Sequence, residues 1–386
     1  MLLRERLSKS LSGFGRLLKA HRRGILLTGW FLFVFAAGGG YFFLAQYFSL
    51  PIINPLGDSE NGPAVTLADP VVKETAQPIT GTFYSEDGAK SWQGNRPLAV
   101  MIDNHMLARP YQYGLQKADL IYEAVAEGGI TRFLAVFHGQ KVDKIGPVRS
   151  SRVYYITWAL EFPAYYAHVG GASTVGSPAN IHTYIAAHGV LDLDQFRLGS
   201  STFSFGGNVL FNGGMVLSHI NYTSTKKLWK AGEALYPGTN RLPNFSKWKL
   251  KADTPYGLRP SKQKIPFSFW SYPEAYKGEW RYDRAVNSYL RFQGGKKHLD
   301  QATKKQLSAK NVVLAHMLDL SAGDGTGHRL YTTTGQGNAE IYRDGIKILA
   351  TWKRSSLSSR MKFYKRGKST EIKFNRGLTW IEIIPK

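Results

Sequence analysis

"RPLAVMIDNHMLARPYQYGLQKADLIYEAVAEGGITRFLAVF", residues 96–137, contains three apolar runs that decide the fold class. The run at 98–102 is short and ends in polar residues, which is typical of a buried strand. The runs within 118–129 and 130–139 meet at two glycines, and their β-branched and aromatic residues favour strands, although the first also fits a helix. We therefore expect three strands here.

Two helices are predicted after these strands. The segment "SSRVYYITWALEFP" (150–163) has two serines that suit a helix cap and a proline that ends the helix. The segment "SPANIHTYIAAHG" (177–189) has Ser177 as its cap, an apolar stripe at helical spacing and Gly189 as its stop. Strands separated by helices predict an α/β layer over roughly 96–240.

The second half of the chain has a different pattern of apolar and polar residues. Segments such as "AEIYRDGIKILATWKR" (339–354) and "LTWIEIIP" (378–385) are short, often alternate in polarity and are separated by turn sequences. The expected fold class is therefore a mixed, layered α/β protein with a β-rich C-terminal part. We place the α/β domain at 96–245 and the β-rich domain at 246–386.

The N-terminal region predicts a membrane anchor. Residues 24–50 contain no charged residue, which exceeds the roughly 20 apolar residues needed to cross a bilayer. Residues 1–23 hold seven Lys or Arg against one Glu and are expected to be a cytoplasmic tail. A cleaved signal peptide is the alternative, but the apolar run is longer than the usual 7–15 residues. The proline-containing segment 51–95 predicts a flexible spacer.

Composition places the rest of the chain outside the cytoplasmic membrane of a bacterium. The 386 residues include no cysteine, so the chain has neither disulfides nor a lipid-bearing cysteine. The formal net charge is +23, and residues 260–386 contribute much of it, with 24 Lys or Arg against 10 Asp or Glu. The predicted partners are the membrane itself and an anionic cell-wall polymer or envelope proteins, and no nucleic acid is expected.

Three arginines form the strongest candidate for a binding site. Arg149 and Arg152 flank the predicted start of a helix, and Arg132 begins a predicted strand. A helix start favours anions, and a guanidinium matches the geometry of a phosphate or carboxylate. The pattern therefore predicts that an anion sits there, either on a ligand or on a nearby side chain.

The alternative is a static ion-pair network inside the fold. Asp103, Glu123 and Glu127 come from neighbouring predicted strands and could pair with the arginines. Asp103, Asn104 and His105 also follow a buried strand directly, where polar residues commonly line the crevice of an α/β sheet. All of these residues are kept as ligand-binding candidates.

Sequence motifs identify neither a catalytic residue nor a cofactor. The chain has no phosphate-binding loop, and the near-match to a nucleophile elbow around Ser173 has Val175 in place of the final glycine. No pair of histidines has the H-x-x-x-H spacing, so no metal site is predicted.

The residues themselves resemble a known family. The stretch at 96–137, "KIGPVRSSR" (144–152), "YYAHVGG" (165–171), "ILATWKR" (348–354) and "GLTWIEIIP" (377–385) are similar to the YerB-like family of bacterial envelope proteins. That resemblance implies a two-part, mixed α/β ectodomain tethered to the outer face of the cytoplasmic membrane. Family members often carry a lipoprotein signal, whereas this chain is expected to use its apolar segment.

A second likeness concerns layout only. The order of strands, arginine segment, glycine-rich turn and helix is similar to that of LytR-CpsA-Psr phosphotransferases, which hold a polyprenyl pyrophosphate with arginines. The aspartate that usually follows their arginine is Ser150 here. The alternative function is therefore a phosphotransferase acting on a polyprenyl-pyrophosphate-linked glycan, and fold-level likeness alone does not establish it.

Overall fold

The computed structural model describes residues 74–211, 215–271 and 273–386. The predicted tail (1–23) and membrane span (24–50) lie outside these residues. Among the helices of the described ranges, none has the length and hydropathy that a membrane crossing requires.

One ten-stranded mixed sheet forms the centre of the described part and takes strands from both halves of the chain. Its order is β21 (Lys362–Lys365), β20 (Ile346–Arg354), β19 (Gly335–Arg343), β16 (Asn311–Met317), β23 (Thr379–Pro385), β4 (Leu120–Glu127), β5 (Ile130–Phe137), β3 (Leu98–Asp103), β6 (Tyr165–His168) and β7 (Leu191–Asp194). The three strands expected within 96–137 are β3, β4 and β5, which confirms the strand interpretation of the ambiguous segment.

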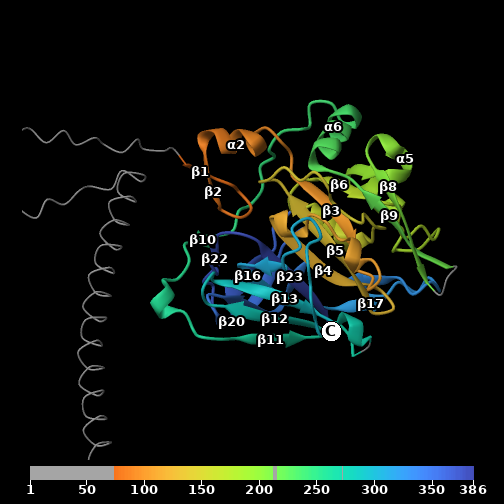
Figure 1. The fold of residues 1–386 in the computed structure, drawn as a ribbon. Helices are drawn as coiled ribbons and strands as arrows, with labels where there is room; N and C mark the ends of the chain where they lie inside the picture. Colours follow the sequence, from red (N-terminus) through yellow and green to blue (C-terminus); the bar gives the residue numbers. More distant parts are fainter. Residues whose placement is uncertain (1–73, 212–214, 272) are drawn as a thin grey trace, which may run out of the picture. The chain divides into compact units, whose positions relative to one another are not determined.

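The two halves of the chain meet inside this sheet. The last strand, β23, pairs in parallel with β4, from Thr379 opposite Leu120 to Glu382 opposite Glu123. In Figure 1 the blue strand β23 lies beside the orange strand β4. The predicted boundary at 245/246 therefore does not separate two independent sheets, and the described residues belong to one compact unit. Local sequence patterns did not predict the pairing of β23 with β4, because the two strands are far apart in the chain.

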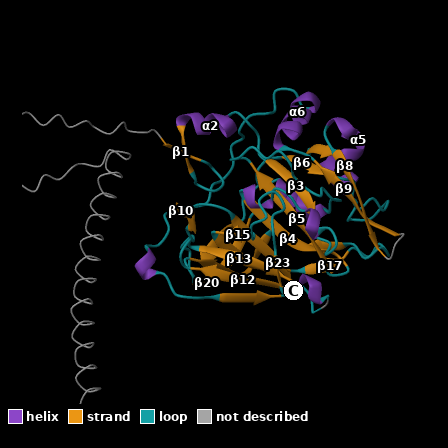
Figure 2. Ribbon diagram, in the orientation of Figure 1, coloured by secondary structure: helices purple, strands orange, loops and turns teal. Residues whose placement is uncertain are grey.

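A second sheet and four strand pairs complete the β structure. The second sheet contains β11 (Lys264–Phe267), β12 (Gly278–Asp283), β13 (Ser288–Gln293), β14 (Lys296–Lys297) and β15 (Ser308–Ala309), with β15 paired to β13. The pairs are β1 (Glu74–Ala76) with β2 (Phe83–Ser85), β8 (Ser204–Phe211) with β9 (Met215–Tyr222), β10 (Leu250–Lys251) with β22 (Phe374–Asn375), and β17 (Asp319–Ser321) with β18 (Arg329–Tyr331). Figure 2 shows that strands make up more of the described part than helices do.

The helices are short and lie on both faces of the ten-stranded sheet. They are α2 (Glu86–Gln93), α3 (Val153–Ala159), α4 (Ile181–Ala187), α5 (Gln195–Leu198) and α6 (Thr225–Leu235), with 3₁₀ turns η1 (Arg109–Tyr111), η2 (Leu115–Lys117), η3 (Gly199–Ser201), η4 (Tyr256–Leu258) and η5 (Glu274–Tyr276). One face, the α3 face, packs against α3 and α4. The opposite face, the α6 face, packs against α6 and the second sheet.

The alternation of side chains along each strand separates these two faces. On β3, Ala99 and Met101 belong to the core of the α3 face, whereas Val100 and Ile102 belong to the core of the α6 face. Successive side chains of a strand point to opposite faces, so a strand buried on both sides has a continuous apolar run. This is why the run at 98–102 is uninterrupted.

Both predicted helices exist, but their caps differ from the expectation. The N-cap of α3 is Arg152, and neither Ser150 nor Ser151 caps it; the Ser151 hydroxyl instead hydrogen-bonds the Tyr166 hydroxyl at 2.6 Å. The helix α4 begins at Ile181, after the predicted cap Ser177. Its N-cap is Asn180, whose side-chain oxygen accepts hydrogen bonds from two backbone amides of the first turn.

The predicted spacer (51–95) is not extended in its last part. Residues 74–93 form β1, β2 and α2, and Trp92 of α2 is buried. The Gln77 side chain contacts the ring of His138, at the end of β5, at 3.1 Å. This N-terminal unit is therefore packed against the sheet, and the sequence pattern missed it because its elements are only three to eight residues long.

Candidate functional site

The predicted site residues lie on opposite faces of the ten-stranded sheet. Asp103 and Arg132, which are register partners on β3 and β5, have side chains on the α3 face, where Arg149 and Glu127 are their charged neighbours. Asn104 contacts Glu123, and both belong to a network on the α6 face. Sequence neighbours at a strand end thus do not share a site, because the side-chain period of a strand is two.

On the α3 face, Glu127 holds two of the three predicted arginines. Its Oε1 accepts a hydrogen bond from Arg132 Nη2 at 2.6 Å, and its Oε2 pairs with Arg152 Nη2. Both arginine side chains are buried, while the Glu127 side chain is 42% exposed. Burial raises the pKa of Glu127, but the two guanidiniums outweigh it, so that this pKa lies below its ordinary value.

The third arginine pairs with a different carboxylate. Arg149 Nε lies 3.4 Å from Asp103 Oδ2, and the other oxygen of Asp103 accepts the backbone amide of His105 at 2.8 Å. Burial lowers the pKa of His105. Asp103 and Glu127 thus pair with the three predicted arginines, as the static ion-pair alternative describes. Glu123 pairs with none of the three and contacts Arg291 instead.

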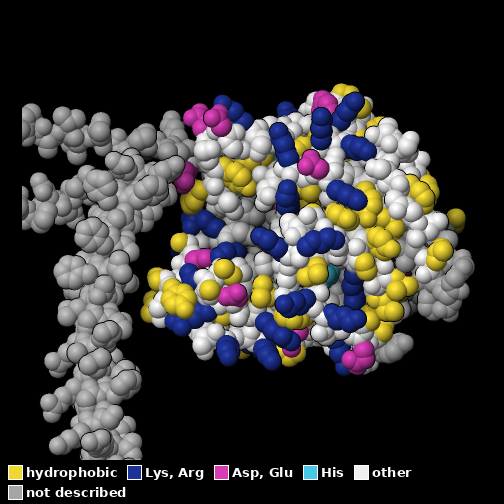
Figure 3. Space-filling model, viewed as in Figure 1, with side chains coloured by type: hydrophobic (Ala, Val, Ile, Leu, Met, Phe, Trp, Pro, Cys, Tyr) yellow, Lys and Arg dark blue, Asp and Glu magenta, His cyan; other side chains and the backbone are white. Residues whose placement is uncertain are grey.

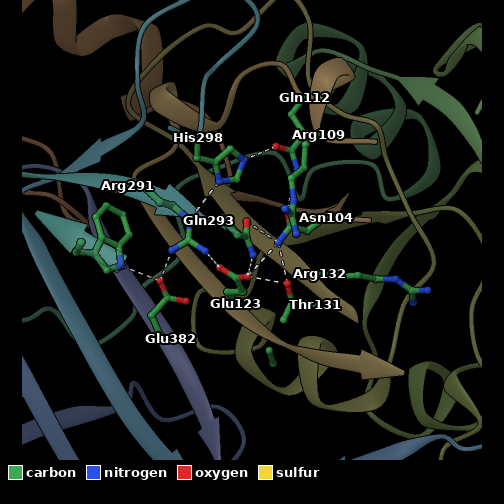
Figure 4. Close-up of polar contacts among 12 residues, drawn as sticks. Asn104, Arg109, Gln112, Glu123, Thr131, Arg132, Arg291, Gln293, His298 and Glu382 are labelled. Carbon is green, nitrogen blue, oxygen red and sulfur yellow. Dashed lines mark hydrogen bonds and ion pairs between the residues drawn. The ribbon is translucent and has the colours of Figure 1, made fainter. Parts of the chain in front are cut away.

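On the α6 face, Glu123 belongs to a fully buried charge network (Figure 4). Arg291 of β13 pairs through Nη2 with Glu123 and through Nη1 with Glu382 of β23. All three side chains have no exposed surface. Burial raises the pKa of Glu382 well above its ordinary value, although Arg291 opposes this shift. One guanidinium thus faces two carboxyl groups, and burial favours the protonated form of one of them, Glu382.

Amide and hydroxyl groups complete the environment of Glu123. Its Oε1 accepts hydrogen bonds from Asn104 Nδ2 at 3.0 Å, from Thr131 Oγ1 at 2.6 Å and from Gln293 Nε2 at 3.2 Å. Figure 4 shows these groups converging on one carboxylate, while Arg132 points away from them. These donors occupy Oε1, while Arg291 Nη2 pairs with Oε2, so both oxygens of the buried Glu123 carboxyl group have partners.

The ring of His298 has a defined tautomer in the same network. Its Nδ1 accepts a hydrogen bond from Arg291 Nε at 3.2 Å, so its Nε2 carries the proton and donates to Gln112 Oε1 at 2.6 Å. Burial, followed by repulsion from Arg291, lowers the pKa of His298 well below its ordinary value. The imidazole is therefore neutral and positions the guanidinium.

A groove of about 470 Å³ opens beside this network. Arg109, Lys296 and Lys297 are its cationic lining residues, and no Asp or Glu is among the residues described there. Arg109 stacks over the Tyr276 ring, with 4.8 Å from its guanidinium carbon to the ring centroid, and its Nε donates to Asn104 Oδ1 at 3.2 Å. Its Nη2 is buried without a hydrogen-bond partner among the described residues. The groove, hereafter the cationic groove, is thus an electropositive concavity between segments of both halves.

The sequence interpretation missed the C-terminal members of the network. Arg291, Gln293, His298 and Glu382 were not predicted, although Arg291 and Glu382 each carry the one charge in a strand rich in apolar residues, "SYLRFQ" and "TWIEIIP". A lone charge in such a run is a signal of a buried, paired charge. No group of three or more His, Asp or Glu that could hold a metal occurs in the described ranges.

These features define a class of two-part α/β protein in which N- and C-terminal halves share one sheet and one buried charge network. Comparisons with known proteins give the family. Residues 80–236 match the N-terminal domain and residues 268–381 the C-terminal domain of a protein family of unknown function, DUF3048. The chain belongs to this YerB-like family.

YerB of Bacillus subtilis supports the assignment both by its sequence and by its crystal structure. The chain is 29% identical over 330 residues to "Putative lipoprotein YerB" of Bacillus subtilis (strain 168), with 81% of this chain and 87% of the relative covered. The crystal structure of the YerB protein from Bacillus subtilis matches with a TM-score of 0.66 and 27% identity, and the match covers 81% of this chain and 97% of that one.

Proposed function

We propose that this chain is a membrane-tethered, extracytoplasmic binding protein that takes an anionic polymer of the bacterial envelope. Its relative carries the description of a lipoprotein, and the apolar segment 24–50 of this chain would supply the tether in place of a lipid. The strongly basic composition, with a net charge of +23, favours an anionic partner.

The cationic groove carries this proposal. Lys296 and Lys297 are exposed, and neither forms an ion pair with another described residue. Together with the half-buried Arg109, they concentrate positive charge in a concavity whose described lining contains no compensating carboxylate. A ligand with phosphate or carboxylate groups would supply the missing counter-charge.

The wider surface agrees with such a ligand. Figure 3 shows many Lys and Arg side chains and fewer Asp and Glu side chains on the face in view. A polymer leaving the groove would therefore meet further cations, which raises the rate of association and makes binding dependent on salt.

A binding measurement with poly(glycerol phosphate) tests the proposal. The full chain in detergent micelles is expected to bind the polymer at low salt, with affinity falling as salt rises. Substitution of Lys296→Ala with Lys297→Ala should weaken binding about tenfold or more, because two charges in a concavity are lost. The matched control is Lys365→Ala with Lys368→Ala, which removes two exposed charges elsewhere. Equal weakening by both pairs would show that the groove has no special role.

The phosphotransferase alternative has less support. Two of the arginines that would hold pyrophosphate, Arg132 and Arg152, are already paired with Glu127. Turnover of a polyprenyl-pyrophosphate glycan donor by the full chain with magnesium would favour the enzyme over the binding protein.

A further inference from the structure

An aromatic pocket lies at the base of the β8–β9 hairpin, apart from the networks described above. Its volume is about 480 Å³, and four of its lining residues, Tyr111, Tyr113, Phe205 and Tyr222, have aromatic rings. Tyr113 and Tyr222 meet edge to face, with ring centroids 5.6 Å apart. The Tyr222 hydroxyl donates a hydrogen bond to the Tyr111 carbonyl oxygen at 3.0 Å, so the rings are held in place before any ligand binds.

Two of these rings are unusually open to solvent. Tyr111 is 44% exposed and Phe205 is 63% exposed, whereas Tyr222 is only 8% exposed. The pocket thus has a buried aromatic ring inside and exposed aromatic rings at its rim. Large exposed rings that surround a concavity mark a binding surface more often than isolated exposed rings do.

Polar groups stand among the rings. The ammonium group of Lys144 lies 4.0 Å from the centroids of both the Tyr113 and the Tyr222 rings, so it is fixed by two cation-π contacts. Asp143, also in the lining, is exposed and forms no ion pair with another described residue. Lys227, which also lines the pocket, donates to Ser204 Oγ at 3.4 Å. Fixed donors and an unpaired acceptor are therefore available.

Close backbone packing shapes this pocket. A Cβ atom on Gly206 of β8 would lie 2.7 Å from Tyr222 Cε2, so only glycine lets the strand pass this close to the ring. The inner wall is thus formed by a ring packed directly against backbone. That arrangement gives the pocket a rigid wall, which suits a rigid ligand.

We propose that the aromatic pocket binds a neutral pyranose ring. Such a ring has apolar C–H faces that pack on aromatic side chains, and it has equatorial hydroxyl groups that hydrogen-bond to charged and hydroxyl side chains. The Asp143 carboxylate accepts from sugar hydroxyls, while Lys144 and Lys227 donate to them. An apolar peptide would leave these polar groups unsatisfied, so the saccharide fits the pocket better.

The turn η1 contributes lining residues to both the pocket and the cationic groove. Arg109 of the turn η1 lines the groove, whereas Tyr111 of the same turn lines the aromatic pocket. Consecutive Cα atoms are about 3.8 Å apart, so the Cα atoms of Arg109 and Tyr111 lie within about 7.6 Å. If the proposed function holds, an anionic glycan would place a sugar in the pocket and a charged group in the groove.

Saturation-transfer NMR and calorimetry on the full chain in detergent micelles test this assignment. The probes are two neutral trisaccharides, tri-N-acetylchitotriose and maltotriose. At least one is expected to bind, and Tyr111→Ala and Asp143→Asn should each weaken that binding about fivefold or more. The control Tyr256→Ala, which removes another exposed tyrosine, should leave binding unchanged.

Two outcomes would overturn the saccharide pocket. One is that neither trisaccharide binds; the other is that Tyr111→Ala and Tyr256→Ala have equal effects. Binding of an apolar peptide that Tyr111→Ala abolishes, without sugar binding, would identify a protein-docking pocket instead. The substitution of Lys296→Ala with Lys297→Ala should not change binding of a neutral sugar. If the unsubstituted chain binds a trisaccharide but not poly(glycerol phosphate), the proposed function is refuted and the saccharide pocket stands.

Discussion

Arg291 and Glu123 are 168 positions apart in the chain, yet they form an ion pair in which neither side chain has any exposed surface. The arginine comes from the region that matches the C-terminal family domain, and the glutamate from the N-terminal one. Two charges taken out of water are tolerated only when their partners remain in place. The pair therefore makes each half of the fold depend on the other.

Loss of Glu123 should destabilise the whole unit. In Glu123→Ala, Arg291 would retain only the carboxyl group of Glu382, whose protonated form burial favours, and would become a buried charge without a full counter-charge. Removal of one partner of a buried pair costs roughly 3–5 kcal/mol. Urea unfolding should show this loss, whereas Glu279→Ala, which breaks a partly exposed pair with Arg281, should cost about 1 kcal/mol or less. Similar losses in both variants would contradict the account.

The raised pKa of Glu382 gives a pH-dependent prediction. Because burial raises its pKa in the folded state, its contribution to stability is fully present below its unfolded pKa and is lost as pH rises through its folded pKa. Glu382→Gln stays neutral and keeps an oxygen that can accept the hydrogen bond from Trp280 Nε1, which is 2.9 Å long in the parent protein. The variant should therefore become more stable relative to the parent as pH rises.

Urea unfolding of both proteins across neutral and alkaline pH checks this prediction. The difference between their free energies of unfolding should grow with pH. A difference that stays constant would mean that Glu382 is ionised in the folded protein throughout.

The strands of the central sheet could be predicted from sequence because each depends on a local apolar run. The run at 98–102 is buried on both faces of the sheet, and burial on both faces is what the uninterrupted pattern indicates. The pairing of β23 with β4 could not be predicted in this way. It joins Glu382 to Glu123 across most of the chain, and no local pattern specifies which strand is its neighbour.

The candidate site was predicted in part for a related reason. The static ion-pair alternative allowed Arg132 to pair with Glu127, and the hairpin between β4 and β5 brings these two residues together. Asn104 was grouped with Asp103, although the period of two places them on opposite faces. The partners of Asn104 and Glu123 include Arg291 and Gln293, which lie on β13 of the second sheet, at least 168 positions further along the chain. Only the tertiary structure could identify them.

The clustering of arginines around Glu127 predicts a latent anion site. In Glu127→Gln, Arg132 and Arg152 would lose their shared carboxylate, and the free energy of unfolding should fall by roughly 1–3 kcal/mol, discounted because Glu127 is partly exposed. Inorganic phosphate should then raise the melting temperature of the variant more than that of the parent, because it replaces the lost charge. Equal phosphate effects on both proteins would show that the arginines are unavailable even without Glu127.

The contact between the N-terminal unit and β5 contains two buried groups with opposite pH responses. Burial lowers the pKa of His138 from 6.5 to about 4, so the stability that it contributes is present above about 6.5 and is lost as pH falls through about 4. Burial raises the pKa of Asp119 from 3.8 to about 6, so its contribution is present below about 3.8 and is lost as pH rises through about 6. The two shifts are of similar size and should largely cancel in the parent between about pH 4 and 6.

Single substitutions of His138 and Asp119 should separate their contributions to the pH dependence of stability. Relative to the parent, His138→Gln should gain stability as pH falls from about 6.5 to 4, because the parent alone loses the histidine contribution. Asp119→Asn should lose stability relative to the parent as pH falls from about 6 to 3.8, because only the parent takes up the proton. The Asp119 carboxylate accepts backbone amides of His138 and Gly139, which His138→Gln preserves, so the two effects are independent. Urea midpoints measured across this range check both slopes, and slopes of the same sign would show that one of the two groups is not buried in the folded protein.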